Sequence, residues 1–282
     1  MRVSPDTAAF AAAAARPGAA APTAPPRRRL PPPSRWGPAA GLVLPLAGLV
    51  FWEALARAGA VPPNWLPAPS VIAGTIRELA VRGELWGHLG ATLTRVASGF
   101  ALGAVAATVL AILTGGSPSL RALLDPTLQA LRNIPSMAWI PLFLLWLGIQ
   151  EASKVTLIAV GAFFPVYLNL LQGILHIDPK LVEVGRVFGY RGLALVRRVL
   201  LPATLPAYLT GLRGSLGLAW MFVVAAEIMG ASRGLGYVMV DGQTSSRADL
   251  ILASLLLFAA LGKASDWLLV QASRRFERGR SA

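Results

Sequence analysis

The stretch Glu183–Pro202, EVGRVFGYRGLALVRRVLLP, is a polar insert between two strongly apolar parts of the chain. It carries four arginines and one glutamate, but no cysteine, no histidine and no pair of side chains that could act as nucleophile and base. Such a mixture of charged and apolar residues is suited to contact with another surface. We therefore interpret the insert as a contact element and expect no catalytic residue in it.

The rest of the chain lacks the residues that nucleotide or metal chemistry requires. A phosphate-binding loop needs the pattern G-x4-G-K-[ST], and none of Lys154, Lys180 and Lys263 lies in it. There is no cysteine, and His88 and His176 are far apart, so no zinc site is expected. We expect no cofactor and no enzymatic activity, and we expect ATP hydrolysis, if it drives this protein, to occur on another polypeptide.

The composition indicates a membrane protein. Of the 282 residues, 55% are hydrophobic and 14% are charged, and the mean hydropathy is +0.60. Soluble domains average about 45–50% apolar and about 25% charged residues. The net charge of +13 comes from short basic clusters between apolar runs, which is typical of loops facing an anionic membrane surface. We expect contact with lipid and none with nucleic acid.

Six apolar runs approach the roughly 20 residues that a helix needs to cross a bilayer. They cover approximately 39–57, 91–114, 134–149, 154–174, 205–229 and 250–271. The start of the third run is uncertain, because the chain enters it through Arg132, Asn133 and Pro135. The sequence thus predicts an all-α integral membrane protein with about six transmembrane helices.

Basic residues predict which side of the membrane each segment faces. They concentrate in segments that share a side with the N-terminus, which places both termini in the cytosol. Residues 1–36 are rich in Ala and Pro and are predicted to be a disordered tail. The membrane domain is predicted at 37–272, and a second basic tail at 273–282. On the outer face, Ser70 is predicted to cap a short helix.

The insert itself is predicted to form two short helices. Asp178 and Pro179 are typical of a helix start, and Gly189 is expected to end the first helix. A second helix is predicted to end at Leu201-Pro202. From this pattern alone, docking into a groove on a partner and lying on anionic lipid are equally good interpretations.

The order of residues in the insert resembles the EAA loop of binding-protein-dependent ABC importer permeases, E-A-A-x3-G-x9-I-x-L-P. Glu183, Gly189 and Val199-Leu200-Leu201-Pro202 match it, whereas Val184 and Gly185 replace the two alanines. The resemblance covers roughly 40–272 and favours the nitrate, taurine and aliphatic sulfonate branch, and within it the aliphatic sulfonate permeases. The further stretches that carry it are Leu66–Pro69, Gly83–Leu89, Leu131–Pro135, Trp146–Ile149, Glu151–Lys154, Gly234–Tyr237 and Leu261–Lys263.

That resemblance implies a type I importer permease with the MetI-like fold, in the bacterial cytoplasmic (inner) membrane. Residues 176–204 would be the coupling loop, which docks into a cytosolic ATPase. Two such ATPase subunits, a periplasmic or lipid-anchored substrate-binding protein and a second copy of the permease are the implied partners. The coupling residues would be Glu183, Gly185, Gly189, Tyr190, Leu201 and Pro202.

Polar residues inside apolar runs are candidates for the substrate pathway, because lipid makes them costly. The candidates are Arg95, Asn169, Trp220 and Glu227. Each also has a structural interpretation, as a residue that reaches the membrane surface or bonds between helices. Lys263 and Asp266, three residues apart, are expected to neutralise each other. Glycines at 211, 214 and 217 are expected to allow close helix approach, as at a dimer axis.

Two alternatives to sulfonate import remain open. One is the same permease role with taurine, nitrate or another small substrate. The other is an autonomous secondary transporter or channel, which would need buried ionisable relays and internal repeats that the sequence does not clearly contain.

Overall fold

The computed structural model describes residues 40–278, and within that range the chain is helical and has no β-strand. The chain divides into two units, Met1–Gly48 and Leu49–Ala282. Of the first unit, the structure describes only the beginning of α2 (Ala40–Arg57), an apolar helix with Pro45 in its interior. The predicted tail at 1–36 lies outside the described residues, as do the last four residues of the predicted tail at 273–282.

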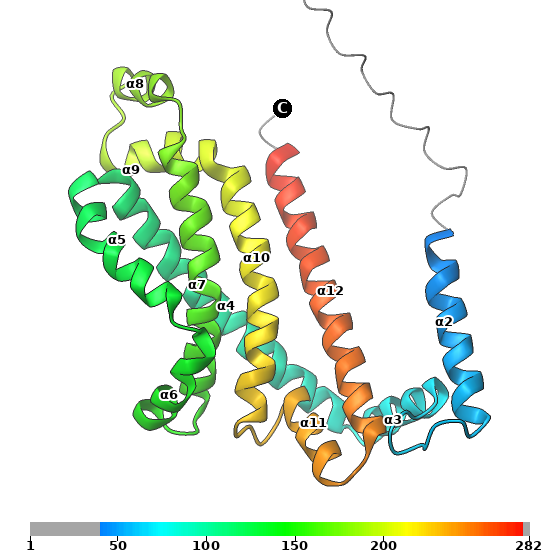
Figure 1. The fold of residues 1–282 in the computed structure, drawn as a ribbon. Helices are drawn as coiled ribbons and strands as arrows, with labels where there is room; N and C mark the ends of the chain where they lie inside the picture. The colour runs from blue at the N-terminus through cyan, green and yellow to red at the C-terminus, as the bar shows by residue number, and fades with distance from the viewer. Residues whose placement is uncertain (1–39, 279–282) are drawn as a thin grey trace, which may run out of the picture. The chain divides into compact units, whose positions relative to one another are not determined.

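The second unit is a bundle of long helices with shorter helices at both ends (Figure 1). Figure 1 shows α8 and α9 at one end, here called the α8 end, and α6 and α11 at the other, the α11 end. After α2 the elements are α3 (Pro69–Val81), α4 (Glu84–Gly116), α5 (Pro118–Asn133), η1 (Ser136–Trp139), α6 (Ile140–Leu147), α7 (Glu151–Leu175), α8 (Pro179–Val187), α9 (Gly192–Leu195), η2 (Val196–Leu200), α10 (Leu201–Ile228), α11 (Leu235–Thr244) and α12 (Ala248–Arg278).

The predicted all-α membrane fold is confirmed. By length and composition, four described helices could cross a membrane: α4, α7, the continuous run from Gly192 to Ile228, and α12. A fifth span results if α5 and the η1–α6 pair are counted as one bent span. The first of the six predicted runs, 39–57, coincides with α2, an apolar helix that lies outside that set.

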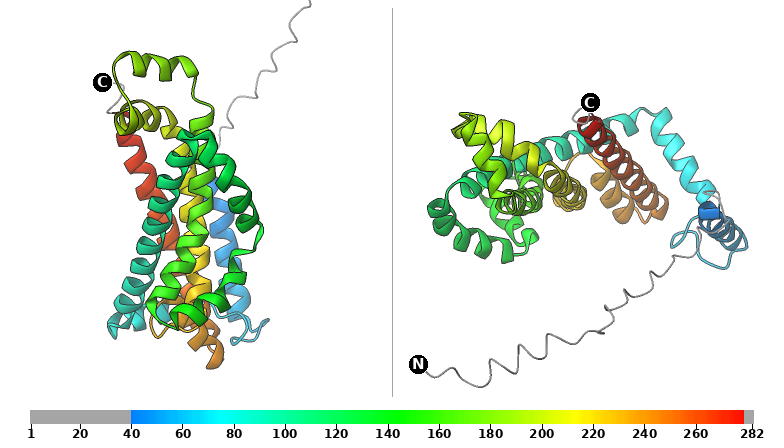
Figure 2. Two further views of the ribbon diagram at one scale, coloured as in Figure 1. Left: turned by 90° about the vertical axis from the view of Figure 1, so that its left-hand side faces the viewer. Right: turned by 90° about the horizontal axis from the view of Figure 1, so that it is seen from above.

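Helices α4, α7 and α10 pack side by side and form the core (Figures 1 and 2). Small residues allow this closeness, as is common between membrane helices. A Cβ atom on Gly99 of α4 would lie 2.6 Å from the side chain of Ile158 on α7. A Cβ atom on Gly211 of α10 would lie 3.0 Å from the Pro165 carbonyl oxygen of α7. Gly211 thus serves a contact within the chain, whereas Gly214 and Gly217 are exposed.

The third predicted span differs from the structure. The sequence predicted it from residue 134 and placed the residues before it, including Arg121 and Arg132, in a basic segment on the side of the N-terminus. In the structure the helix begins at Pro118 and bends by 91° between Asn133 and Ser136. The bend has a local cause, because proline disfavours a helical conformation in the residue before it. Ile134, which precedes Pro135, accordingly has an extended ψ angle of 121°, and Pro135 itself has a ψ of 123°. Arg121 and Arg132 are therefore on a helix of the bundle, not in a loop.

Two further expectations about polar residues were wrong. Ser70 does not cap α3, whose N-cap residue is Ala68. Instead the Glu53 carboxylate accepts hydrogen bonds from the Ser70 amide (3.0 Å) and hydroxyl (2.7 Å), so a carboxylate from α2 caps α3. Asp266 pairs with Arg213 of α10 (3.0 Å) rather than with Lys263. The group that caps α3 and the partner of Asp266 both come from another helix. The spacing of neighbouring residues in the sequence does not indicate such contacts.

Candidate functional site

The loop at the α8 end begins as the sequence predicted. The Asp178 side chain accepts a hydrogen bond from the Lys180 amide (2.9 Å), and Pro179 occupies the first turn. The helix ends at Val187, and Gly189 follows with φ of +81°, a conformation that side chains other than glycine rarely adopt. The chain therefore turns sharply between the two arms of the loop.

The second arm does not end at Leu201-Pro202, as predicted. It continues through α9 and η2 into α10, whose first turn contains Pro202. The η2 segment is a π-helix, in which the Leu201 amide donates to the Val196 carbonyl five residues back. The wider π turn is a physical means of accommodating a proline ring that would clash with the carbonyl four residues back in an α-helix.

Gly185 and Tyr190 connect the two arms. Gly185 is buried, and a Cβ atom there would lie 2.8 Å from the Val199 side chain in η2. The Tyr190 amide donates to the Gly185 carbonyl (3.0 Å), and the Arg198 guanidinium lies 4.9 Å from the Tyr190 ring centroid. Glycine at position 185, where the E-A-A pattern has its second alanine, therefore lets the two arms approach closely. Glu183 itself is exposed.

Large apolar side chains of this loop have no covering element in the described part of the chain. The exposed residues are Leu181, Val184, Val187, Phe188 and Leu193, of which Val187 is 86% exposed. Leu181, Val184 and Phe188 lie on one side of α8 by their spacing of three and four residues. These five exposed apolar residues are here called the coupling face. An exposed apolar patch flanked by charged residues is typical of a protein–protein contact.

A buried ionic cluster lies at the α11 end, around Glu227 of α10. The Glu227 side chain is 0% exposed and that of Arg95, on α4, is 5% exposed, and they form an ion pair at 2.8 Å. The Thr92 hydroxyl (2.8 Å) and the Gly236 amide (2.8 Å) also donate to the Glu227 carboxylate. The carboxylate is therefore fully paired, as a buried charge must be.

Arg95 also bonds to α7 and to the segment that follows α10. It donates twice to Glu151 at the start of α7 (2.6 and 2.7 Å) and once to the Arg233 carbonyl (2.6 Å). The Glu151 side chain is 61% exposed, so this half of the cluster reaches the surface. The guanidinium thus holds together α4, α7 and the segment that follows α10.

The cluster also positions residues 230–236, which join α10 to α11 and include the start of α11; this segment is here called the outer loop. The Leu235 amide donates to Thr92 (3.0 Å) and the Gly234 amide to His88 (3.1 Å). Cβ atoms on Gly234 and Gly236 would each lie 2.5 Å from Glu227 atoms. The glycines of the Gly234-Leu235-Gly236-Tyr237 stretch are therefore needed for the loop to close over the carboxylate.

The sequence identified Arg95 and Glu227 as candidates but not their partners. Glu151, Thr92 and Lys154 were missed, although Lys154 is buried and donates to the Ile149 carbonyl (2.9 Å). A signal was available: with the predicted topology, the start of α4, the start of α7 and the end of α10 all lie at one end, and each carries a charged residue. Charged residues of opposite sign that the predicted topology places at the same membrane depth could have been paired from the sequence.

The other two pathway candidates lie between helices. The Asn169 amide donates to the Pro165 carbonyl (2.8 Å) within α7, and its Cβ faces Gly211 of α10. The Trp220 indole donates to the Ser265 hydroxyl of α12 (2.8 Å) and its ring packs edge-on against Phe258. Both arrangements are those of helix–helix contacts; a role in the pathway stays a prediction.

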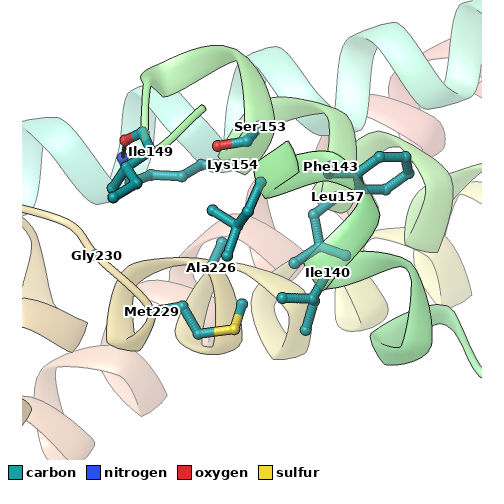
Figure 3. Close-up of a pocket in the computed structure, with 10 residues that line it drawn as sticks. Ile140, Phe143, Ile149, Ser153, Lys154, Leu157, Ala226, Met229 and Gly230 are labelled. Atoms are coloured by element: carbon teal, nitrogen blue, oxygen red, sulfur yellow. Dashed lines mark hydrogen bonds between the residues drawn. The ribbon is translucent and has the colours of Figure 1, made fainter. Parts of the chain in front are cut away.

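A small cavity lies beside the cluster, between α6, the start of α7 and the end of α10 (Figure 3). Its volume is about 20 Å³, which is room for about one water molecule. Figure 3 shows Lys154 extending past the cavity toward Ile149. This cavity is too small for an organic substrate.

Comparisons with known proteins agree with this architecture. Residues 99–278 match the family described as binding-protein-dependent transport system inner membrane component. The chain is 42% identical over 249 residues to the aliphatic sulfonates transport permease protein SsuC of Bacillus subtilis (strain 168), covering 88% of this chain and 90% of that protein. It is 32% identical over 218 residues to the taurine transport system permease protein TauC of Escherichia coli (strain K12), covering 76% and 79%.

Among solved structures, an inward-facing MetNI methionine ABC transporter is similar, with a TM-score of 0.53 and 25% identity over 73% of this chain and 97% of that chain. The family match spans more than half of the chain, and the first of the two relatives exceeds 40% identity over most of it. The chain therefore belongs to the binding-protein-dependent transport system inner membrane components, the multi-pass permease subunits of ABC importers.

Proposed function

We propose that this permease carries aliphatic sulfonates into the cell as one of two identical subunits, driven by two separate ATPase subunits. The sulfonate assignment rests on the similarity to a permease named for aliphatic sulfonates, at 42% identity, against 32% for one named for taurine. A separate ATPase is proposed because none of the three lysines lies in a phosphate-binding loop.

The observation that carries the proposal is the coupling face. Five large apolar side chains of the loop are exposed at the end that the basic residues place in the cytosol. An ATPase with a matching groove would bury them, with the exposed Glu183 and Arg186 at the edge of the contact. Gly185, Gly189 and Tyr190 would keep the two arms of the loop in the shape that docks.

The stretch from η2 to Ile228 would transmit movement of the loop across the membrane. It is helical from Gly192 to Ile228 without a break, and it ends at the Glu227 cluster and the outer loop. Leu201 and Pro202 directly follow the π turn, an irregular turn of the kind that is frequent at functional sites. The outer loop, held by Glu227 and Arg95, is the surface proposed to receive the substrate-binding protein.

The experiment is co-purification of the ATPase with the tagged permease. Val187→Glu places a charge on the coupling face and should remove most of the ATPase from the purified complex. Val81→Glu is the matched control, because Val81 is 79% exposed at the end of α3, near the α11 end. Equal recovery of the ATPase with both variants would show that the coupling face is not the docking surface.

A further inference from the structure

A groove of about 270 Å³ runs between α5 and α7; its α5 side carries charged and polar side chains, whereas α7 contributes mainly apolar ones. From α5 it is lined by Arg121, Asp125, Leu128, Gln129 and Arg132. Arg121, Asp125, Gln129 and Arg132 follow one another at intervals of three or four residues, which places them on one side of the helix. The exposed Leu123 lies outside the groove. Helix α5 therefore turns the half-buried Arg121 and Asp125 toward α7, while Gln129 and Arg132 lie at the exposed rim of the groove.

The two arginines of this groove have no carboxylate partner in the described part of the chain. The seven ion pairs among residues 43–274 include neither Arg121 nor Arg132. The one acid in the groove, Asp125, accepts a hydrogen bond from Gln129 (3.2 Å). The two arginines lie 11 residues apart, which is about 16 Å along a helix, so each is a separate positive centre. An anion is the ligand that either would bind.

An apolar cavity of about 390 Å³ adjoins the groove and shares Leu128 and Phe164 with it. Aromatic rings of Trp139, Phe143 and Phe163 line it, and Thr156 is the single hydroxyl among its lining residues. Leu131 lines the apolar cavity, and the next residue, Arg132, lines the polar groove. The two compartments meet at Leu128 and Phe164, and Arg132 lies one helical turn beyond Leu128, beside the 91° bend between α5 and η1.

We propose that the groove and the apolar cavity together form a binding site for an amphiphilic organic anion. Arg132, with Gln129 one turn away, contacts the anionic headgroup, and the cavity between α4, α5, η1, α6 and α7 takes the aliphatic tail. Arg121 is a second contact for the headgroup on the way to the α8 end. The inference rests on the proposed function and names the residues that select the substrate.

The two compartments discriminate between sulfonates. Transfer of each methylene of an alkyl tail into an apolar cavity should tighten binding by about four-fold. The ammonium group of taurine would lose its hydration in the same place without a polar partner. Propane-1-sulfonate, which has a methyl group where taurine has the ammonium, should therefore bind at least ten-fold more tightly than taurine.

The test uses the permease–ATPase complex in nanodiscs without the substrate-binding protein, so that only the permease binds the ligand. Calorimetry gives the Kd of alkane-1-sulfonates from methane- to hexanesulfonate, and of taurine. Arg132→Gln should weaken binding of every sulfonate by about ten-fold, and Arg132→Lys should restore part of it. Arg77→Gln, at an exposed position of α3, is the control and should change nothing.

The tail compartment has its own test. Ala106 lines the apolar cavity from α4, so Ala106→Phe should fill it. Binding of hexanesulfonate should then weaken to near that of methanesulfonate, whose own affinity should not change. If affinity in the wild-type complex does not depend on tail length, or if Ala106→Phe affects all sulfonates alike, the cavity holds lipid or a second copy of the chain and the inference is wrong.

Measurements of uptake distinguish a failure of this inference from a failure of the proposed function. If the complete system with its binding protein takes up no alkanesulfonate, the proposed function fails. If it takes up alkanesulfonates but Arg132→Gln binds them as tightly as the wild type, only the site assignment fails. If Arg132→Gln weakens sulfonate binding only when the nanodisc contains anionic lipid, Arg132 binds a lipid headgroup. That result would also overturn the site.

Discussion

Removal of the positive charge from the Glu227 cluster is the perturbation whose energetic effect follows most directly from the structure. Arg95→Leu would leave the Glu227 carboxylate, whose side chain is 0% exposed, without its counter-charge. Breaking a buried ion pair from one side typically costs about 3–5 kcal/mol. The Thr92 hydroxyl and Gly236 amide would still donate to the carboxylate, so we expect the lower end, about 3 kcal/mol.

Two companion variants separate charge from the loss of packing. Glu227→Gln leaves Arg95 paired with Glu151, and it should cost about 1–2 kcal/mol. The double variant Arg95→Leu/Glu227→Gln no longer contains the unpaired Glu227 carboxylate. It should therefore be more stable than Arg95→Leu alone. Glu151→Gln is the control: its side chain is 61% exposed, so the loss should be at most about 1 kcal/mol.

The assay is unfolding of the purified permease in mixed micelles, followed by tryptophan fluorescence as the denaturing detergent is raised. The reasoning predicts the order Arg95→Leu, then the double variant, then Glu151→Gln, from least to most stable. If Arg95→Leu and Glu151→Gln cost the same within about 0.5 kcal/mol, or if the double variant is the least stable, the cluster does not act as a buried ion pair.

Three other variants test packing at the loops and between helices. Gly234→Ala places a methyl group 2.5 Å from the Glu227 carboxyl carbon, at a residue whose φ is +126°. It should destabilise the permease by about 1–3 kcal/mol in the same assay. The control Gly74→Ala, whose methyl group meets open space, should not destabilise it. Gly185→Val should force α8 from η2 and lower ATPase recovery several-fold, while Gly87→Val keeps it. Trp220→Phe removes the bond to Ser265 and should cost about 0.5–1.5 kcal/mol; no change in unfolding would show that this contact is not structural.

Hydropathy predicted the long helices because α4, α7, α10 and α12 each contain a long stretch of high mean hydropathy with few charged residues. It missed the start of the bent span because Arg121, Asp125 and Arg132 lower the average over α5. These charges lie on one face, toward the groove. A search for helical periodicity would have identified α5, whereas an averaged window interprets the same residues as a loop.

Local chemistry predicted the loop where the cause is local. The Asp178 cap, Pro179 in the first turn and the turn at Gly189 depend on neighbouring residues alone, and all three are present. The interpretation of Leu201-Pro202 as a helix end failed because a π turn accommodates the proline. The partners of Arg95 and Asp266 come from helices far away in the sequence, and a single sequence does not reveal such pairs.

The central claim is that an exposed loop receives mechanical work from a separate ATPase. Its most direct test is uptake of labelled alkanesulfonate into proteoliposomes with ATP and the binding protein on their respective sides. The account predicts accumulation against a gradient by the complex of permease and ATPase, none by the permease alone, and none by a complex with Val187→Glu. Accumulation by the permease alone, or full uptake with Val187→Glu, would contradict it.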